Sequence, residues 1–166
     1  LTVVAASARS AGKSYEEAVG PRWAMTTPIP EEAKSLVVLD ALADRETIAS
    51  SVDFIFCAVD MKKEEIRALE ESYAKLECPV ISNNSAHRWT PDVPMVIPEV
   101  NPEHLQVIQA QKSRLGTRRG FIAVKSNCSI QSYAPALHPL RRFGITQVLV
   151  CTYQAISGAG KTFTTW

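Results

Sequence analysis

The residue most capable of covalent chemistry lies in the run Ser126-Asn127-Cys128-Ser129. This run follows an apolar stretch at 121–125 and precedes a second apolar segment that begins at Ile130. A strand that delivers a cysteine into the first turn of a helix places the sulfur near unpaired backbone N–H groups, which together with the helix dipole favour the thiolate. A thiolate is the form that attacks a carbonyl carbon. The pattern therefore indicates Cys128 as a nucleophile, and a buried cysteine at a strand end is the alternative.

A second group of polar residues, near the start of the chain, could bind a phosphate. Ser7, Arg9 and Ser10 offer two hydroxyls and a guanidinium, with Gly12 close by and no carboxylate before Glu16. In a dinucleotide-binding fold, the loop after the second strand meets the adenosine ribose. A carboxylate there selects the 2′-hydroxyl, whereas basic and hydroxyl groups accept a 2′-phosphate. We therefore predict a phosphate-binding loop, with a solvated polar turn as the alternative.

Two further segments could contact a ligand. Gln154 precedes a turn with Gly158 and Gly160, where backbone can approach a flat ligand and an amide can hold a carbonyl or a water. Arg88 precedes the proline-bounded segment 91–94. A rigidly held guanidinium can donate two parallel hydrogen bonds to an oxyanion or a phosphate. An ordinary turn and a surface arginine are the respective alternatives.

The apolar pattern predicts strands that alternate with helices. Strands are expected at 1–6, 35–39, 54–59, 79–82, 121–125 and 147–153. These runs are short, rich in β-branched residues and nearly continuously apolar, which is typical of a parallel sheet covered on both faces. The alternation predicts an α/β fold in which the carboxyl ends of the strands bind ligands. The polar loops at 7–13, 82–85, 127–128 and 154–161 should therefore converge on one side of the sheet.

The clearest helix is predicted over 61–76, where Ile66, Leu69, Tyr73 and Leu76 recur at spacings of three and four. Asp60 is expected to cap it. Its solvent-exposed face is expected to carry Glu64, Glu65, Glu70, Glu71 and Lys75. Further helices are expected at 104–114, ending at Gly116, and at 130–143, interrupted by Pro135 and Pro139 and closed by Gly144.

The bulk composition excludes several classes of function. Apolar residues make up 46% and charged residues 21% of the chain, and the net charge is +1. Such a charge gives no field for nucleic acid or an acidic membrane surface, and no apolar run reaches the ~20 residues of a membrane span. His87, His104 and His138 show no ligand spacing, so we expect no metal site. We predict neither a nucleic-acid nor a membrane partner.

The remaining cysteines suggest a reducing compartment. Cys57, Cys78 and Cys151 lie far apart in apolar runs, as buried free thiols usually do. We therefore expect a cytoplasmic protein with no disulfide framework.

Taken together, these segments resemble a known enzyme family. The motifs that carry the resemblance are, in order, 6–13 (ASARSAGK), 84–88 (NSAHR), 91–94 (PDVP), 97–104 (IPEVNPEH), 126–129 (SNCS) and 154–160 (QAISGAG). They resemble aspartate-β-semialdehyde dehydrogenase, and most closely its archaeal and fungal form. The resemblance implies NADP-dependent interconversion of L-aspartyl-4-phosphate and aspartate semialdehyde, a step of aspartate-family amino-acid biosynthesis, in a homodimer or homotetramer.

The resemblance also implies roles for individual residues. Cys128 would form an acyl-thioester, Asn127 and Arg88 would bind the phosphate of the substrate, and Gln154 would orient the substrate. Ser7, Arg9 and Ser10 would hold the 2′-phosphate of NADP. Asn84 and Gly158 would lie near the nicotinamide.

The chain also departs from the family pattern. The family begins with a strand and a Gly-rich pyrophosphate loop, and its general-base histidine follows a later motif; this sequence contains neither. We therefore expect residues 1–127 to form a partial Rossmann-type NADP-binding domain that lacks its first strand. Residues 128–166 are expected to begin an α+β catalytic and dimerisation domain. By itself such a fragment should be inactive.

Three alternatives remain open at this point. An N-acetyl-glutamyl-phosphate reductase uses the same thioester chemistry, although the Ser7 loop and the Gln154 string favour the aspartyl enzyme. A non-catalytic module would show no aldehyde oxidation. A cysteine hydrolase is the weakest alternative, since no histidine lies in a motif that would pair with Cys128.

Overall fold

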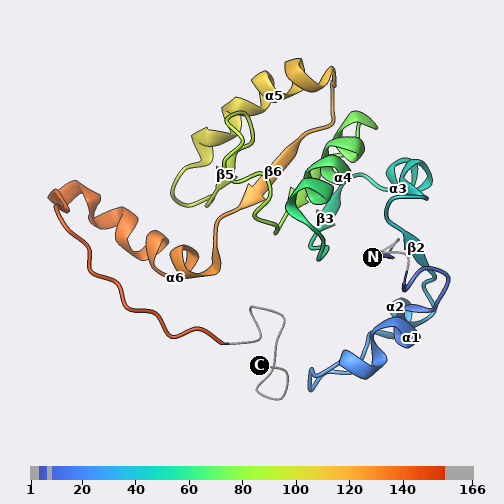
Figure 1. Cartoon of the computed structure of the whole chain (residues 1–166). Coiled ribbons are helices and arrows are strands. Elements are labelled where there is room, and N and C mark those ends of the chain that lie inside the picture. Colours follow the sequence, from blue (N-terminus) through green and yellow to red (C-terminus); the bar gives the residue numbers. More distant parts are fainter. Residues whose placement is uncertain (1–3, 7–8, 156–166) are drawn as a thin grey trace.

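The computed structural model describes residues 4–6 and 9–155, which form an α/β structure of parallel strands and short helices (Figure 1). The strands are β1 (Val4–Ala6), β2 (Val38–Asp40), β3 (Ile55–Cys57), β4 (Val80–Ser82), β5 (Met95–Val96) and β6 (Ile122–Lys125). The α-helices are α1 (Tyr15–Val19), α2 (Glu31–Lys34), α3 (Arg45–Ser51), α4 (Lys63–Lys75), α5 (Ile108–Leu115) and α6 (Cys128–Leu137). The 3₁₀ helices are η1 (Gly20–Arg22), η2 (Pro102–Val107) and η3 (His138–Phe143).

Within the described residues the strands form two parallel sheets. β1 pairs with β2, with Val4 opposite Val38. The other sheet has the order β3-β4-β6-β5, with Ser82 at the end of β4 opposite Val124 of β6. Because these strands run parallel, the carboxyl ends of β3, β4 and β6 meet at one edge, as the sequence predicted for the loops at 82–85 and 127–128. The loop at 7–13 instead follows β1 of the other sheet, and no strand is described before residue 154 in the segment 145–155. The short strand β5 was not predicted.

Helix α4 packs against β4 and β6 with the apolar stripe that its sequence predicts. Ile66, Leu69 and Tyr73 are buried. The prediction for Glu70 is wrong: this residue is 0% exposed rather than part of the solvent-exposed face. Glu70 lies four residues after Ile66, and residues at i and i+4 share one face of a helix. The helical period therefore places this carboxylate on the buried side.

The helix boundaries differ in part from those predicted. Asp60 does not cap α4; instead the backbone N–H of Lys62 donates to the Glu65 carboxylate at 3.1 Å. Gly116 and Gly144 do end α5 and η3, with left-handed φ values of 72° and 71°. Glycine adopts this conformation without the steric cost that a Cβ atom brings.

One apolar core joins the two sheets. Tyr73 of α4 reaches across it, and its hydroxyl donates to the carbonyl oxygen of Ala41 at 2.6 Å. Burial raises the pKa of Tyr73 to about 12. Val80 and Ile122, at the starts of two central strands, are fully buried in the same core.

A largely apolar cavity of about 460 Å³ lies between the sheets. Its lining includes Ala5 of β1 on one side and Ile55 and Cys57 of β3 on the other. Among the described residues, β1 pairs only with β2 and β3 only with β4, so each sheet has an unpaired edge strand at this cavity.

The amino edge of the four-stranded sheet is held by side chains that bond to backbone. The Glu77 carboxylate accepts backbone N–H groups from Arg118 (3.0 Å), Arg119 (2.5 Å) and Gly120 (2.9 Å), just before β6. These bonds lower the pKa of Glu77 to about 2. They fix the chain at the start of β6, the strand that leads to Cys128.

A buried amide completes the pairing of β6. Gln111 of α5 is fully buried, and its Nε2 donates to the carbonyl oxygens of Ile122 (3.0 Å) and Asp92 (2.9 Å). Its Oε1 accepts the N–H of Ile122 at 2.6 Å. The side chain thus satisfies backbone groups of β6 before β5 pairs with that strand at Val124.

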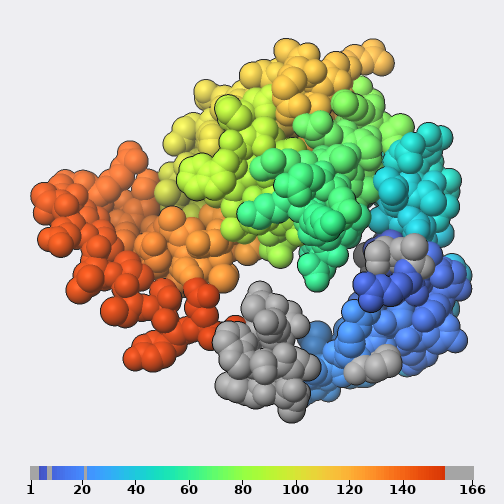
Figure 2. Space-filling model, in the orientation of Figure 1, coloured from blue at the N-terminus to red at the C-terminus, as the bar shows by residue number. Residues whose placement is uncertain are grey.

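The strand predicted at 147–153 does not form in the structure. Residues 145–155 are extended and exposed, and they trace a thin orange-red arm at the edge of the molecule (Figure 2). Cys151 is correspondingly exposed, whereas Cys57 and Cys78 are buried as predicted. A β-branched run becomes a strand only where a partner supplies hydrogen bonds and a packing surface. No described strand lies beside this segment.

The part of the chain that the structure describes lacks two kinds of feature. No helix there is both long and apolar enough to cross a membrane. No group of His, Cys, Asp and Glu side chains there could hold a metal ion.

Candidate active site

Several of the predicted site residues lie at the carboxyl edge of the four-stranded sheet. The loop at 83–88 follows β4, and the run 126–128 follows the neighbouring strand β6. Because the ends of adjacent parallel strands lie side by side, the two loops are neighbours. The loops therefore bring Arg88 and Cys128 to the same part of the edge.

Cys128 is the first residue of helix α6 and is exposed. The preceding Asn127 is the N-cap: its Oδ1 accepts the backbone N–H of Ile130 at 2.9 Å. The first backbone N–H groups of a helix have no carbonyl partner within the helix. The sulfur is thus placed beside donors that can stabilise negative charge on a thiolate or on the oxygen of an attacked carbonyl.

Arg88 is held against the end of β6. Its Nε donates to the carbonyl oxygen of Lys125 at 3.1 Å, and its Nη2 donates to that of Ser126 at 3.4 Å. Lys125 and Ser126 lie three and two residues before Cys128, respectively. The guanidinium has further N–H donors beyond these two. It can therefore position the loop and also bind an anion.

Gln154 and Asn127 also lie around the start of α6. The amide Nε2 of Gln154 donates to the hydroxyl of Ser129, the residue after Cys128. Asn127 uses its oxygen for the helix cap, which leaves its NH₂ group as a donor for an anion. Sequence reasoning chose both residues, and the structure places both beside Cys128.

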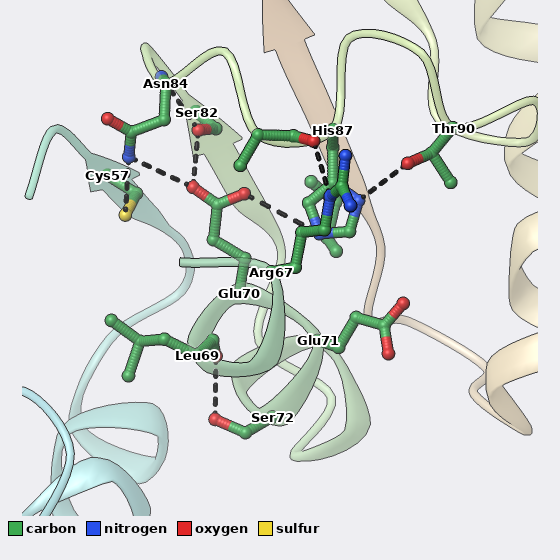
Figure 3. Close-up of polar contacts among 12 residues, drawn as sticks. Cys57, Arg67, Leu69, Glu70, Glu71, Ser72, Ser82, Asn84, His87 and Thr90 are labelled. Carbon is green, nitrogen blue, oxygen red and sulfur yellow. Dashed lines mark hydrogen bonds and ion pairs between the residues drawn. The ribbon is translucent and has the colours of Figure 1, made fainter. Parts of the chain in front are cut away.

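Asn84 lies at the start of the loop after β4, and a buried network fixes it (Figure 3). Its Nδ2 donates to Glu70 Oε1 at 3.2 Å and contacts Cys57 Sγ at 3.5 Å. Its backbone N–H donates to the hydroxyl of Ser82 at 3.0 Å. Burial raises the pKa of Cys57 to about 12, so this thiol stays protonated and is a poor nucleophile compared with an exposed thiol.

The predicted phosphate-binding loop follows β1 in the two-stranded sheet. Arg9 is exposed there, and no carboxylate among the described residues pairs with it. Gly12 has a φ of 83°, and its N–H donates to the carbonyl oxygen of Val38 at 2.8 Å, which turns the loop back onto β2. Ser10 lies within the turn. Ser7 and Gly158 lie outside the described residues.

Comparison with known proteins assigns the chain to a family. The model that describes the NAD binding domain of semialdehyde dehydrogenases matches residues 1–108. The chain belongs to this family. The Rossmann-type fold predicted from the sequence is thereby confirmed.

Curated relatives of the semialdehyde dehydrogenase family align along nearly the whole chain. The aspartate-semialdehyde dehydrogenase of Aspergillus fumigatus is 38% identical over 162 residues, which cover 96% of this chain and 43% of that protein. The enzyme of Methanothermobacter thermautotrophicus is 40% identical over 161 residues, which cover 96% and 44%. The chain therefore spans less than half the length of the curated relatives that it matches.

Solved structures of the family have the same architecture. An aspartate-semialdehyde dehydrogenase from Candida albicans, determined with NADP, superposes with a TM-score of 0.70 at 32% identity. That alignment covers 86% of this chain and 39% of the other. A second enzyme, aspartate semialdehyde dehydrogenase II from Vibrio cholerae, gives a TM-score of 0.67 at 27% identity over 95% of this chain and 39% of the other.

Sequence reasoning assigned no role to two buried residues next to the candidate site, Glu70 and His87. Glu70 lies on α4 and is 0% exposed, and His87 lies within the loop 83–88 and is 1% exposed. Figure 3 shows both side chains in the network below Asn84. A signal for Glu70 was present, because it falls between Leu69 and Tyr73 on the apolar stripe of its helix. His87 lies inside the motif 84–88, but no pattern there indicates that its side chain is buried.

Proposed function

We propose that the complete protein carrying this chain is an NADP-dependent aspartate-semialdehyde dehydrogenase. It would catalyse the reductive dephosphorylation of L-aspartyl-4-phosphate in aspartate-family amino-acid biosynthesis. The observation that carries the proposal is the position of Cys128, at the first residue of α6 with the Asn127 cap before it and Arg88 bonded to the preceding backbone. The family match and relatives of this name at up to 40% identity support the same reaction.

The chemistry starts with attack of the Cys128 thiolate on the acyl carbon of aspartyl phosphate. The new C–S bond forms, the bond between that carbon and the phosphate oxygen breaks, and inorganic phosphate leaves. Arg88 and the NH₂ group of Asn127 hold the phosphate. Backbone N–H groups at the start of α6 stabilise the oxyanion, an interaction that often makes the largest single contribution to such reactions.

The resulting thioester on Cys128 is then reduced to the aldehyde. Bound NADPH supplies the hydride for this step. The C–S bond breaks, aspartate semialdehyde leaves, and the Cys128 thiolate is regenerated. Gln154, beside Ser129, orients the substrate throughout.

The residues around β1 fit the cofactor. Arg9 is exposed and unpaired among described carboxylates, and Ser10 adds a hydroxyl in the same turn, a donor set that suits the 2′-phosphate of NADP. Ser7 belongs to the same proposed subsite. Asn84 and Gly158 are proposed for the nicotinamide end.

The division of the chain is also a proposal. Residues 1–127 would belong to the cofactor domain and residues 128–166 to the start of the catalytic domain. The apolar cavity between β1 and β3 would receive a further parallel strand of the cofactor domain, because both flanking strands have unpaired edges and apolar walls. We further propose a cytoplasmic homodimer or homotetramer.

The test is phosphate-dependent reduction of NADP by the complete protein with aspartate semialdehyde, alongside its intact mass. Replacement Cys128→Ser should lower the rate more than about a thousandfold while NADP affinity stays nearly unchanged. Cys151→Ser is the matched control and should retain the rate. A serine variant at position 128 that keeps most of the rate would show that the nucleophile is misassigned.

The same assay tests the substrate. N-acetylglutamate semialdehyde should not replace aspartate semialdehyde, because every relative described above is an aspartate enzyme. A preference for N-acetylglutamate semialdehyde would contradict the proposed substrate, but it would leave the proposed thioester chemistry unaffected.

A further inference from the structure

Glu70 is a buried carboxylate without a lysine or arginine within ion-pair distance among the described residues. It is 0% exposed, and among the described residues the one basic side chain within 4.0 Å of it is His87, whose Nε2 lies 4.0 Å from Oε2. Burying a carboxylate is costly unless hydrogen bonds compensate. Its hydrogen bonds come from Ser82, at the end of β4, and from Asn84, in the loop that follows.

One carboxylate oxygen of Glu70 accepts two donors from this loop region. Ser82 Oγ donates to Oε1 at 2.5 Å, and Asn84 Nδ2 donates to the same atom at 3.2 Å. The Ser82 oxygen also accepts the backbone N–H of Asn84 at 3.0 Å. A hydroxyl has one proton, and here that proton points to Glu70, so Oε1 acts as an acceptor toward both partners.

This network decides which end of the Asn84 amide faces outward. A flipped amide would place Oδ1 about 3.2 Å from the carboxylate oxygen, and two acceptors at that distance repel each other. The NH₂ group therefore points inward to Glu70 and Cys57. Figure 3 shows the amide oxygen of Asn84 pointing away from the buried network.

The rest of the loop is held from the same helix. Arg67 Nε donates to the carbonyl oxygen of Ala86 at 2.7 Å. His87 Nδ1 lies 3.1 Å from the Thr90 hydroxyl, and burial lowers the pKa of His87. Glu70 Oε2 and His87 Nε2 have no hydrogen-bond partner in the described structure. Arg67 of α4 thus fixes the loop backbone, while Glu70 of the same helix, with the weaker acceptor Cys57, fixes the Asn84 amide.

We propose that Glu70 is a positioning residue for the nicotinamide cofactor: it turns Asn84 so that its carbonyl oxygen accepts from the carboxamide NH₂ group of the nicotinamide. This inference rests on the proposed function, which places Asn84 at the nicotinamide end. The nicotinamide ring offers one conventional hydrogen-bond donor, the carboxamide NH₂, and an acceptor oxygen is its complement. An outward NH₂ group on Asn84 would meet that donor with another donor.

The first test compares NADPH with its reduced 3-acetylpyridine analogue, in which a methyl group replaces the carboxamide NH₂. Dissociation constants are measured by titration of the complete protein. The wild type should bind the analogue about tenfold more weakly, the value of one hydrogen bond. In Glu70→Met, where the Asn84 amide is free to turn, the penalty should fall below about threefold, and in Asn84→Ala it should vanish. An unchanged tenfold penalty in Glu70→Met overturns the proposal.

The second test preserves side-chain volume and covers the case in which Glu70→Met does not fold. Asn84→Asp alone sets two carboxylates against each other and should weaken NADPH binding at least about tenfold. The double change Glu70→Gln with Asn84→Asp restores a donor opposite an acceptor, and it should recover affinity to within about threefold of the wild type. A double variant that binds no better than Asn84→Asp rejects the positioning role.

These outcomes separate the two proposals. A wild-type protein that binds no NADPH contradicts the proposed function and this inference with it. Tight NADPH binding without an analogue penalty overturns only the role of Glu70 and Asn84.

Discussion

Two glutamates near helix α4, seven residues apart in sequence, behave in opposite ways. Glu77, at the amino edge of the sheet, is bonded by three successive backbone N–H groups, and its pKa is lowered to about 2. Glu70, toward the carboxyl edge, is fully buried and leaves Oε2 without a hydrogen-bond partner among the described residues. The Glu77 carboxylate links the end of α4 to the backbone before β6. The Glu70 carboxylate holds the Asn84 side chain in one orientation.

The comparison extends to the two edges as a whole. At the amino edge, Gln111 and Glu77 satisfy backbone groups at the start of β6. At the carboxyl edge, Asn127 uses its amide oxygen for the helix cap, and Arg88 uses two of its N–H groups to bind backbone carbonyls. The NH₂ group of Asn127 and the other N–H groups of Arg88 remain as donors for a ligand. Changes at the amino edge should therefore alter stability without altering cofactor binding, and changes at the carboxyl edge should do the reverse.

The largest effect is expected from Gly120→Ala at the amino edge. A Cβ atom here would lie 1.8 Å from the carbonyl oxygen of Ala74, a backbone atom that cannot move aside alone. We expect a loss of about 3–5 kcal/mol in the free energy of unfolding, measured by denaturant titration. Gly20→Ala is the matched control: nothing lies within 4 Å of its Cβ position, and its effect should stay within about 1 kcal/mol. Equal effects at the two glycines would contradict the close approach of α4 to β6.

The next largest effect is expected from Gln111→Leu. The change leaves the N–H and carbonyl oxygen of Ile122 and the carbonyl oxygen of Asp92 without this partner. A loss of about 2–4 kcal/mol in unfolding free energy follows from several unsatisfied buried groups. Gln109→Leu, at an exposed position on the same helix, should change stability by less than about 0.5 kcal/mol. NADPH affinity should be unchanged in both variants. A loss of affinity in Gln111→Leu alone would contradict the expectation that changes at the amino edge leave cofactor binding unaltered.

Arg9→Glu tests the nucleotide loop that follows β1. NADP affinity should fall about 10–150-fold, because a charge-assisted hydrogen bond to the 2′-phosphate is worth about 1.5–3 kcal/mol. NAD affinity should change little, and the melting temperature should not move. Arg118→Glu makes the same charge change at the amino edge and should leave both affinities intact. Parallel losses for NADP and NAD in Arg9→Glu would remove Arg9 from the 2′-phosphate site.

The smallest effect is expected from Glu77→Gln, and it should depend on pH. Because the folded-state pKa of Glu77 is about 2, below the ordinary glutamate value of 4.5, its contribution to stability is complete above pH 4.5. That contribution is lost as the pH falls toward 2. The melting temperature of the variant should therefore lie below that of the wild type at neutral pH, and the difference should shrink between pH 4.5 and 2. Glu64→Gln, at an exposed site on α4, controls for the charge change; a pH-independent difference for Glu77→Gln would point to another cause.

Much of this molecule was predictable because its signals are local in the sequence. Apolar runs located β3, β4 and β6, and the helical spacing of Ile66, Leu69 and Tyr73 located α4. The order of polar loops after strands predicted that the loops at 82–85 and 127–128 share one edge of the sheet, whereas the position of Arg88 at that edge came from the structure. Short elements without such periodicity, including α1, α2 and β5, were not found.

The sequence by itself determined the parallel α/β class, the family and the residue at the start of α6. Each depends on residue order and local hydrogen bonding, which neighbours in the chain specify. Only the tertiary structure decided which groups surround the Glu70 carboxylate and that residues 147–153 form no strand among the described elements. Hydrogen-bond partners and strand pairing come from distant segments, here Ser82 and Asn84 for Glu70, so no local pattern of charge or β-propensity could fix them.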